Sequence, residues 1–414
     1  MKLTKYKIKD IAKTSSGGTP KSTIREYYEN GTIPWINSGE LSQSFITETS
    51  NYITELGYKN SSAKIFPKEE TVLLAMYGAT AGKASLLQID ACTNQAICAI
   101  MPDKKVVEPL FLKYKLDTMY KYLVGLSTGS ARDNLSQAGI GDIEIELPDL
   151  DTQRRIASVL SNLDRKIALN RQINTNLEAL ARQLYDYWFV QFDFPDANGK
   201  PYKSSGGKMV YNEQLKREIP KGWEVKQMDE VIEIRSGFPF QSSTYLPKGK
   251  YRIITIKNVQ DGYLDINDTD FIEELPKRIP DYCILKKGDT LVSLTGNIGR
   301  VGRVYTTNLL LNQRVGFVDS KIGFTNWAYL FLTTTQIRQQ IEKLGIGSAQ
   351  SNVSPIQIGK IKMVLPPLAL LSNFEQRVAP MLNQIISNSE ENSSLTRQRD
   401  ELLPLLMNGQ VSVE

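Results

Sequence analysis

The sequence contains no histidine among its 414 residues. This excludes a histidine general base, Ser-His-Asp and Cys-His catalytic arrangements, and metal sites with imidazole ligands. Only three cysteines are present, Cys92, Cys98 and Cys283, and they form no CxxC pair. Their number and spacing indicate a reducing compartment, with neither a disulfide framework nor a zinc ribbon.

Long apolar runs are also missing, because no stretch of about 18 apolar residues occurs. We therefore expect no transmembrane helix and no membrane partner. The first residues, MKLTKYKIKDIAK, carry lysines but no following apolar segment, unlike a secretory signal peptide. The expected location is the cytoplasm.

No catalytic motif stands out. The glycine turn 78–83 (GATAGK) is one residue too short for a phosphate-binding loop, and Ala84 replaces the hydroxyl that binds magnesium. The matching segment 295–300 (TGNIGR) lacks both features, so a tight strand-to-strand turn is favoured. The pair Pro366-Pro367 has no preceding acid or amide and no following aromatic residue, unlike the catalytic loop of amino-methyltransferases. We expect no catalytic residue, no metal and no bound cofactor.

The composition is that of an ordinary globular protein, with 41% hydrophobic and 23% charged residues. The net charge of +5 and the pI of about 8.8 are mildly basic. Such a charge is compatible with nucleic-acid binding, but a chance excess of surface lysines accounts for it equally well.

What the sequence does contain is a long heptad pattern over residues 155–189, which predicts one helix. One predicted seam position consists of Ile156, Leu163, Asn170, Leu177 and Leu184. The other consists of Val159, Lys166, Ile173, Leu180 and Tyr187. Two of these residues are polar, as in seams that fix helix register at some cost in stability.

A second copy of this pattern lies near the C-terminus. One phase contains Val378, Ile385, Asn392, Arg399 and Leu406, and the other contains Met381, Asn388, Leu395 and Leu402. Asn170 and Asn392 are 222 residues apart, as are Arg155 and Arg377. The helix is predicted to break near Pro404 and to end in a C-cap at Asn408-Gly409.

The segments before the two helices repeat one another as well. Asn94-Gln95 recurs as Asn312-Gln313, and the loop 129–136 recurs as 347–354, each 218 residues later. Strands are predicted at 33–37, 71–76 and 143–148, a strand after Asn94, and a helix at 110–122. Ser136 and Ser354 are predicted helix N-caps, with Pro355 at the first helical position.

Because about thirty residues of helix span on the order of 50 Å, an isolated helix of this kind would expose its apolar seam. We expect the two helices to pair antiparallel as a rigid spacer between two globular domains. The alternative is that each helix packs on its own domain. Asn170 and Asn392 meet only if both lie near the crossing midpoint.

Several segments resemble the specificity subunits of type I restriction-modification systems. The resemblance spans nearly the whole chain and is carried by the segments 16–20 (SGGTP), 33–36 (IPWI), 184–189 (LYDYWF), 192–195 (FDFP), 218–225 (EIPKGWEV) and 399–409 (RDELLPLLMNG). Each string is short, and it is their colinear order that makes the resemblance specific.

The resemblance implies an α+β fold, with two pseudo-repeated α/β target recognition domains separated by two long helices in an antiparallel coiled coil. The expected divisions are residues 1–150 and 223–368 for the recognition domains, 151–195 and 369–414 for the spacer helices, and 196–222 for a linker. The implied function is non-catalytic: each domain reads one half of a bipartite asymmetric site in double-stranded DNA. The implied partners are two methyltransferase (modification) subunits, which bring S-adenosylmethionine, and restriction subunits with ATP-driven translocase activity.

Candidate DNA-binding residues lie in the repeated loops, where arginine and amide side chains are suited to reading base edges. In the first domain they are Lys21, Arg25, Lys83, Ser130 and Arg132. In the second they are Gln241, Lys257, Asn258, Arg300, Arg303, Ser348 and Gln350.

For each group a plainer interpretation remains open. Lys21, Arg25 and Lys257 are explained equally well as solvated charges. Asn134 and Asn352 are equivalent in two domains expected to read different bases, which favours a structural role. Arg132 and Gln350 differ at equivalent positions, as specificity residues should, and the shared basic residue at 83 and 300 favours phosphate contact.

Two further alternatives concern larger features. The aromatic cluster at residues 185–194 is interpreted as a core where helix meets domain, with a docking site for the modification subunit as the alternative. For the whole chain, the alternatives are a self-contained DNA methyltransferase with an unrecognised catalytic site and an interaction scaffold unrelated to DNA.

Overall fold

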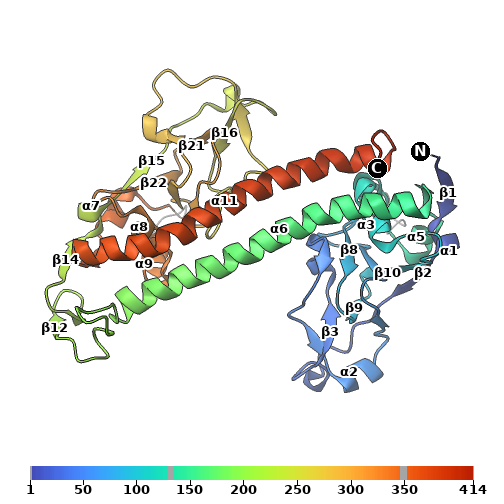
Figure 1. Ribbon diagram of the computed structural model, residues 1–414, viewed down its shortest axis with the longest axis horizontal. Coiled ribbons are helices and arrows are strands. Elements are labelled where there is room, and N and C mark those ends of the chain that lie inside the picture. Colours follow the sequence, from blue (N-terminus) through green and yellow to red (C-terminus); the bar gives the residue numbers. More distant parts are fainter. Residues whose placement is uncertain (1, 129–134, 346–351, 414) are drawn as a thin grey trace. The chain divides into compact units, whose positions relative to one another are not determined.

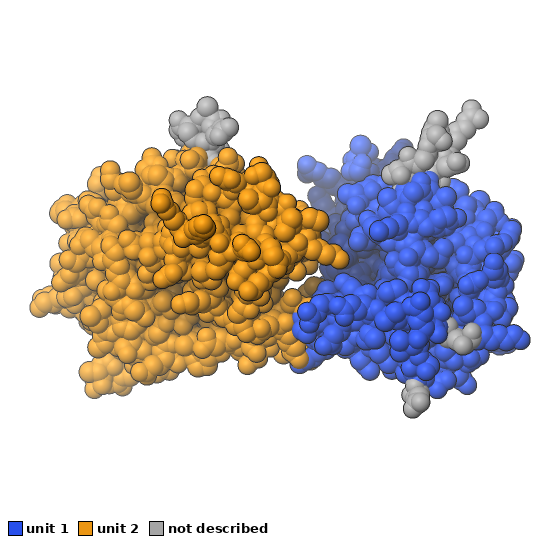
Figure 2. Space-filling model, turned by 90° about the horizontal axis from the view of Figure 1, so that it is seen from above, with its two compact units in different colours: residues 1–167, 394–414 blue, residues 168–393 orange. Residues whose placement is uncertain are grey.

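The computed structural model describes residues 2–128, 135–345 and 352–413. These residues form two compact units, residues 1–167 with 394–414 and residues 168–393 (Figure 2). Two long helices, α6 (Leu150–Tyr185) and α11 (Leu368–Met407), contribute residues to both units (Figure 1).

Unit 1 is built on two mixed sheets and a short strand pair. The larger sheet has the order β2 (Ala12–Ser16), β10 (Ile97–Pro102), β7 (Val72–Ala75), β8 (Ala84–Leu87), β4 (Phe45–Ile46). The second sheet has the order β5 (Tyr52–Ile53), β3 (Ile33–Ile36), β9 (Ala91–Thr93), β6 (Ile65–Phe66). The separate strand pair consists of β1 (Thr4–Lys7) and β11 (Glu144–Leu147). The helices of unit 1 besides the two long ones are α1 (Ile8–Ile11), α2 (Glu55–Lys59), α3 (Pro109–Thr118), α4 (Tyr120–Thr128) and α5 (Gln137–Asp142), with 3₁₀ turns at Arg25–Tyr27 and Ser38–Ser42.

Unit 2 repeats this order. Its sheets are β15 (Ile232–Ser236), β22 (Val315–Ser320), β19 (Thr290–Ser293), β20 (Val301–Arg303), and β17 (Asp270–Ile272), β16 (Tyr251–Ile254), β21 (Leu309–Leu311), β18 (Ile284–Leu285). Two strand pairs are added, β14 (Glu224–Gln227) with β23 (Lys362–Leu365), and β12 (Met209–Asn212) with β13 (Arg217–Pro220). The helices are α7 (Met228–Val231), α8 (Thr325–Thr333), α9 (Thr335–Gly345) and α10 (Pro355–Gly359), with 3₁₀ turns at Ser242–Thr244 and Asp281–Cys283.

The repeat extends to strand direction and register. β3 runs parallel to β9 through the pair Trp35 and Cys92, and β16 runs parallel to β21 through Ile253 and Leu310. β7 and β19 each lie between two antiparallel neighbours. Such nearly continuous apolar strands, covered on both faces, give each unit its own core.

The capping predictions are confirmed. The hydroxyls of Ser136 and Ser354 accept hydrogen bonds from the backbone N–H groups of Gly139 and Gln357, at 3.0 and 3.2 Å. Pro355 occupies the first turn of α10, where its missing N–H costs no hydrogen bond. The predicted helix 110–122 is instead two helices, α3 and α4, separated at Met119.

The ends of the long helices differ in part from the prediction. α6 begins earlier, at Leu150, because the carboxylate of Asp149 accepts hydrogen bonds from the N–H and hydroxyl of Thr152. Its last residues continue as a π-helix over Asp186–Val190. The predicted break near Pro404 is wrong, since α11 continues to Met407. The C-cap is confirmed: Gly409 has φ +69°, and the N–H of Gln410 donates to the Leu405 carbonyl at 2.9 Å.

The predicted seam of α6 is half correct. Ile156 and Asn170 are buried, but Ile173, Leu180 and Tyr187 of the second seam position have exposed fractions of 36%, 48% and 38%. The buried residues lie one position further along, at Leu160, Ile167, Ala181 and Trp188. The second seam position can be placed either three or four residues after the first, and both choices give apolar residues along α6. The sequence pattern does not distinguish the two, and the buried set is the one at four residues. In α11 every predicted seam residue is buried or half-buried.

Within unit 2, α6 and α11 lie side by side and antiparallel, because partners of rising number on α6 have falling numbers on α11. The amide of Asn170 donates to Asn392 Oδ1 at 3.1 Å and to Glu391 Oε2 at 2.6 Å. One turn further, the amide of Asn388 donates to Asn174 Oδ1 at 2.8 Å. Asn170 and Asn392 therefore meet.

These contacts also correct the helix alignment. α11 begins 218 residues after α6, the offset found for Asn94 and Asn312. At this offset Asn170 is the counterpart of Asn388 and Asn174 that of Asn392. The 222-residue match of Asn170 with Asn392 thus joins two residues in contact rather than two equivalent residues.

The aromatic cluster is core in large part. Trp188, Phe189 and Phe192 are buried, and the ring centroids of Phe189 and Phe374 are 4.8 Å apart. Phe194 stacks on Trp223 with centroids 5.1 Å apart. These rings join the end of α6 to the start of α11 and the strands of unit 2.

Candidate nucleic-acid interface

In unit 1 four turns lie together at one end of the two sheets, and we call these residues, 17–21, 37–40, 76–83 and 94–96, the first loop edge. The N–H of Met76 donates to the Ala96 carbonyl at 2.8 Å, and the hydroxyl of Thr80 donates to the Ser38 carbonyl at 2.7 Å. Thr19 donates a hydrogen bond to Gln95. Segments up to 76 residues apart are thereby joined into one surface.

The second loop edge, residues 237–241, 255–258, 294–300, 312–314 and 352–353, is also joined by backbone hydrogen bonds, one of which has a direct counterpart in unit 1. The N–H of Leu294 donates to the Arg314 carbonyl at 3.2 Å, as Met76 does to Ala96. The N–H of Gln313 donates to Phe238 at 3.0 Å, and that of Val353 to Leu294 at 2.9 Å. In both units the hairpin turn is thus bonded in the same way to the turn that follows the Asn-Gln pair.

Glycine is required where these segments cross. A Cβ on Gly17 would lie 1.9 Å from the Thr93 carbonyl oxygen, and one on Gly237 would lie 2.5 Å from that of Asn312. Gly82 and Gly299 have φ of +78° and +80°, a conformation that L side chains rarely adopt. The turns at 78–83 and 295–300 are tight connections in β-hairpins, as predicted, between β7 and β8 and between β19 and β20.

The described cationic candidates of unit 1 are exposed. Lys21 lies in the first loop edge and Arg25 in the following 3₁₀ turn, and neither side chain forms a hydrogen bond or ion pair within the described part of the chain. Lys83 places its ammonium 4.4 Å from the centre of the Tyr120 ring. All three remain available to an anionic ligand.

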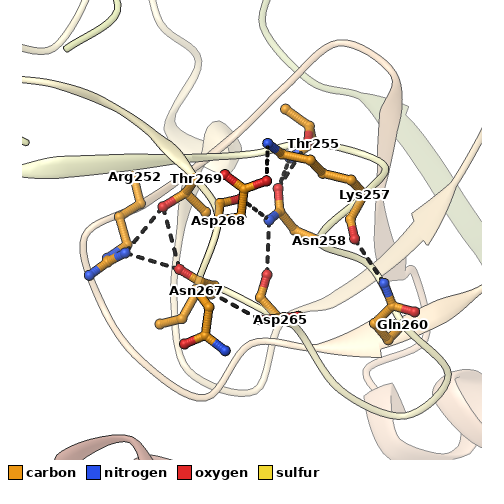
Figure 3. Close-up of polar contacts among 10 residues, drawn as sticks. Arg252, Thr255, Lys257, Asn258, Gln260, Asp265, Asn267, Asp268 and Thr269 are labelled. Carbon is orange, nitrogen blue, oxygen red and sulfur yellow. Dashed lines mark hydrogen bonds and ion pairs between the residues drawn. The ribbon is translucent and has the colours of Figure 1, made fainter. Parts of the chain in front are cut away.

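In unit 2, Lys257 is exposed and forms an ion pair of 2.9 Å with Asp268 (Figure 3). The exposed fraction of the Asp268 side chain is 90%. An ion pair so open to water contributes little stability, so a phosphate can replace it. Gln241 is exposed. Its backbone carbonyl accepts a hydrogen bond from the hydroxyl of Thr244, the last residue of the 3₁₀ turn.

Asn258 has a structural role in the folded unit. Its side chain is buried, its Oδ1 accepts from the Thr255 N–H at 2.9 Å, and its amide donates to the carbonyls of Asp265 and Asp268 (Figure 3). Because all its polar atoms have partners, breaking them would cost about 1–3 kcal/mol each. Burial therefore argues against the prediction that Asn258 contacts DNA.

Arg303 is buried as well. Its guanidinium donates to Asn326 Oδ1 at 2.6 Å and to the Gly288 carbonyl at 2.9 Å, and burial lowers its pKa. Because its donors are already bonded to partners in the interior, Arg303 is poorly placed to contact DNA. Arg300, at the hairpin turn, is half-buried and donates to Gln260 Oε1 at 2.7 Å.

The remaining candidates, Ser130, Arg132, Ser348 and Gln350, lie outside the described residues. Asn352 is described: its Oδ1 accepts from the Thr295 hydroxyl at 2.9 Å. This bond ties the chain before α10 to the hairpin turn, which fits the structural role that its repetition favours.

Exposed residues of the loop edges that sequence reasoning missed include Tyr77, Gln313 and Arg314. Tyr77 begins the first hairpin turn with an exposed fraction of 42%. Gln313 and Arg314 form the tip of the turn after β21. The sequence signal that could have identified Gln313 and Arg314 is the repeated Asn-Gln pair. Alanine follows the pair in the first copy and arginine follows it in the second.

The described residues contain no group of three or more aspartate, glutamate or cysteine side chains placed to hold a metal ion. The three cysteines are buried, and burial raises the pKa of the Cys92 and Cys98 thiols to about 12. Such thiols stay protonated and poorly nucleophilic at neutral pH. Within residues 2–128, 135–345 and 352–413, none of the helices is both long and apolar enough to cross a bilayer.

A second surface lies on the part of α6 that belongs to unit 2 and on the π-helix that follows it. Leu169, Ile173, Leu180 and Tyr187 follow one another on one helix face and are exposed. We call these four residues the apolar stripe. Exposed apolar side chains that recur along one helix face form a candidate interaction site.

Comparison with known proteins gives consistent matches along the chain. A family model described as the type I restriction modification DNA specificity domain matches residues 2–179 and 220–396. The specificity subunit of the type I restriction enzyme MjaIX from Methanocaldococcus jannaschii is 30% identical over 415 residues, covering 99% of this chain and 93% of the relative. The MjaVIII specificity subunit of the same organism is 25% identical, covering 99% and 92%.

One solved structure has the same fold. It is the crystal structure of a type I restriction-modification system S subunit from M. genitalium, with a TM-score of 0.63 and 18% identity. The match covers 98% of this chain and 96% of that one.

Proposed function

Because the chain belongs to the family of type I restriction modification DNA specificity proteins, we propose that it is the non-catalytic specificity subunit of such a complex. Each recognition domain reads one half of a bipartite, asymmetric site in double-stranded DNA. The observation that carries this proposal is the loop edge, which is built twice on one backbone frame with different side chains. The alternative of a self-contained methyltransferase receives no support from the relatives.

The two kinds of contact are divided between different residues. Lys21, Arg25, Lys83, Lys257 and Arg300 are proposed to bind phosphates, which supply affinity and salt dependence. Gln241 and the candidates outside the described residues, Ser130, Arg132, Ser348 and Gln350, are proposed to face the bases.

The recognition domains are proposed to be residues 1–150 and 223–368, with 196–222 as the linker. The spacer helices, 151–195 and 369–414, are proposed to form an antiparallel coiled coil. The paired asparagines of unit 2 and the bond from Arg399 to Asp164 in unit 1 support this pairing. In this proposal the length of the helix pair sets the gap between the half-sites.

The helices also dock the partner proteins in this proposal. Two modification subunits bind them and bring S-adenosylmethionine, and restriction subunits join the complete complex. The apolar stripe supports docking in unit 2, because its four side chains keep exposed fractions of 36–55%. We expect Leu180→Glu to weaken capture of the modification subunit while leaving the chain folded.

The experiment that tests the function is a map of methylated adenines in cells that carry this chain with its modification subunit. The expected motif has two specific halves and an unspecified gap. Replacing residues 223–368 with the corresponding segment of the MjaVIII relative should change one half only. If the purified chain alone transferred methyl groups from S-adenosylmethionine to DNA, the non-catalytic role would be wrong.

A further inference from the structure

Arg314 occupies a turn that exists in both units. The N–H of Val315 donates to the Asn312 carbonyl at 2.9 Å, and the Asn312 side chain accepts from the Arg314 N–H at 3.3 Å. In unit 1 the N–H of Ala96 donates to Asn94 Oδ1 at 3.1 Å. Asparagine therefore closes both turns through its side chain, and residues 96 and 314 are equivalent.

The two equivalent side chains have opposite environments. Ala96 is buried, with an exposed fraction of 6%. Arg314 is exposed, and within the described residues its guanidinium has no hydrogen bond, ion pair or ring contact. An exposed arginine without an internal partner keeps all five of its donors for a ligand.

The backbone beneath Arg314 is fixed. Its carbonyl accepts from Leu294, and Leu294 in turn accepts from Val353, so the turn, the hairpin and the chain before α10 are joined. The neighbouring Gln313 is also exposed, and its N–H is held by Phe238. A long side chain on so rigid a turn presents its guanidinium with little conformational freedom lost in the backbone.

We infer that Arg314 reads a guanine in the half-site of the second recognition domain, and that the first domain makes no such contact because Ala96 replaces it. The inference rests on the proposed function. A guanidinium donates two parallel hydrogen bonds to O6 and N7 of guanine, whereas a phosphate contact carries no base preference. Arg314 is thus a specificity residue that distinguishes the two domains.

The test compares Arg314→Ala and Arg314→Lys in the complex with the modification subunit, with adenine methylation mapped on a random-sequence DNA library. Both variants should lose preference for guanine at one position of one half-site, by roughly 10- to 100-fold. Lysine retains the charge but lacks the planar fork, so it separates base reading from phosphate attraction.

Arg278→Ala is the matched control. Arg278 is an exposed arginine of unit 2 that follows Ile272, and Ile272 pairs with Tyr251 at the end of β16 away from the second loop edge. The control should keep the complete motif. Thermal melting of each purified variant checks that the fold is unchanged.

The outcomes separate the inference from the proposed function. An unchanged motif in an active Arg314→Ala complex would overturn the inference and leave the proposed function standing. Uniform weakening at every site, rescued by lysine, would identify a phosphate contact and also overturn it. Absence of any sequence preference with the unaltered chain would instead refute the proposed function.

Discussion

The two loop edges share a backbone and differ in side chains. Tyr77, exposed in unit 1, is replaced by Thr295, whose hydroxyl is bonded to Asn352. At the next turn, buried Ala96 is replaced by exposed Arg314. The frame is maintained by glycines and by asparagine turns, so side chains at its tips can change without altering the fold. This separation of frame and tip is what a reader of two different DNA half-sites requires.

The two units also differ in how each holds its segment of α6. In unit 1 the Tyr114 hydroxyl donates to Asp164 at 2.7 Å, and Arg399 of α11 donates to the other oxygen at 2.7 Å. In unit 2 the Tyr329 hydroxyl donates to Glu178 at 2.7 Å. At the 218-residue offset Tyr114 corresponds to Leu332, so different positions make similar anchors. The repeat is therefore closer in the loop edges than in these anchors.

The largest expected effect concerns the length of the two long helices. We predict that one heptad inserted after residue 167, matched by one heptad before residue 394, lengthens the gap in the methylated motif by about 3 base pairs, since seven residues add about 10 Å of helix. Both half-sequences should persist. Methylation mapping measures the gap, and a heptad in one helix only is the control, which should abolish specific methylation. An unlengthened gap in the doubly extended chain would contradict the spacer role.

The next largest effect concerns the anchors. Asp164→Ala leaves Arg399 and Tyr114 without their shared acceptor and is expected to lower the free energy of unfolding by about 4 kcal/mol, because the site is buried. Glu178→Ala should cost less, about 2 kcal/mol, since the exposed fraction of its side chain is 19%. Urea unfolding followed by circular dichroism measures both. Equal losses of unfolding free energy in the two variants would contradict the prediction that the more buried carboxylate contributes more.

The smallest effect concerns the basic residue of each hairpin turn. Lys83→Ala and Arg300→Ala should each weaken DNA binding by the complex a few-fold and lower the slope of log affinity against log salt concentration by about 1. The methylated motif should stay the same for both. Asp268→Ala is a useful companion, because it frees Lys257 and should strengthen binding slightly. A changed motif in either basic variant would assign base reading to that position.

Much of the frame was predictable because it depends on local chemistry. The glycine turns, the serine caps and the repeated Asn-Gln turn are each determined within a few residues, and the 218-residue repeat follows from matching them. The roles of Asn258 and Arg303 were not predictable, since their partners lie in segments adjacent only after folding. For Asn258 these include the carbonyls of Asp265 and Asp268.

The long helix shows the same division. The sequence by itself determined that a helix exists, that it recurs, and that asparagines interrupt its seam, because heptad spacing and helix propensity are local properties. Only the tertiary structure decided which of two apolar stripes is buried and that Asn170 pairs with Asn392 while Asn174 pairs with Asn388. A periodic pattern fixes which residues share a face, but the surface packed against that face decides whether it becomes core or remains exposed.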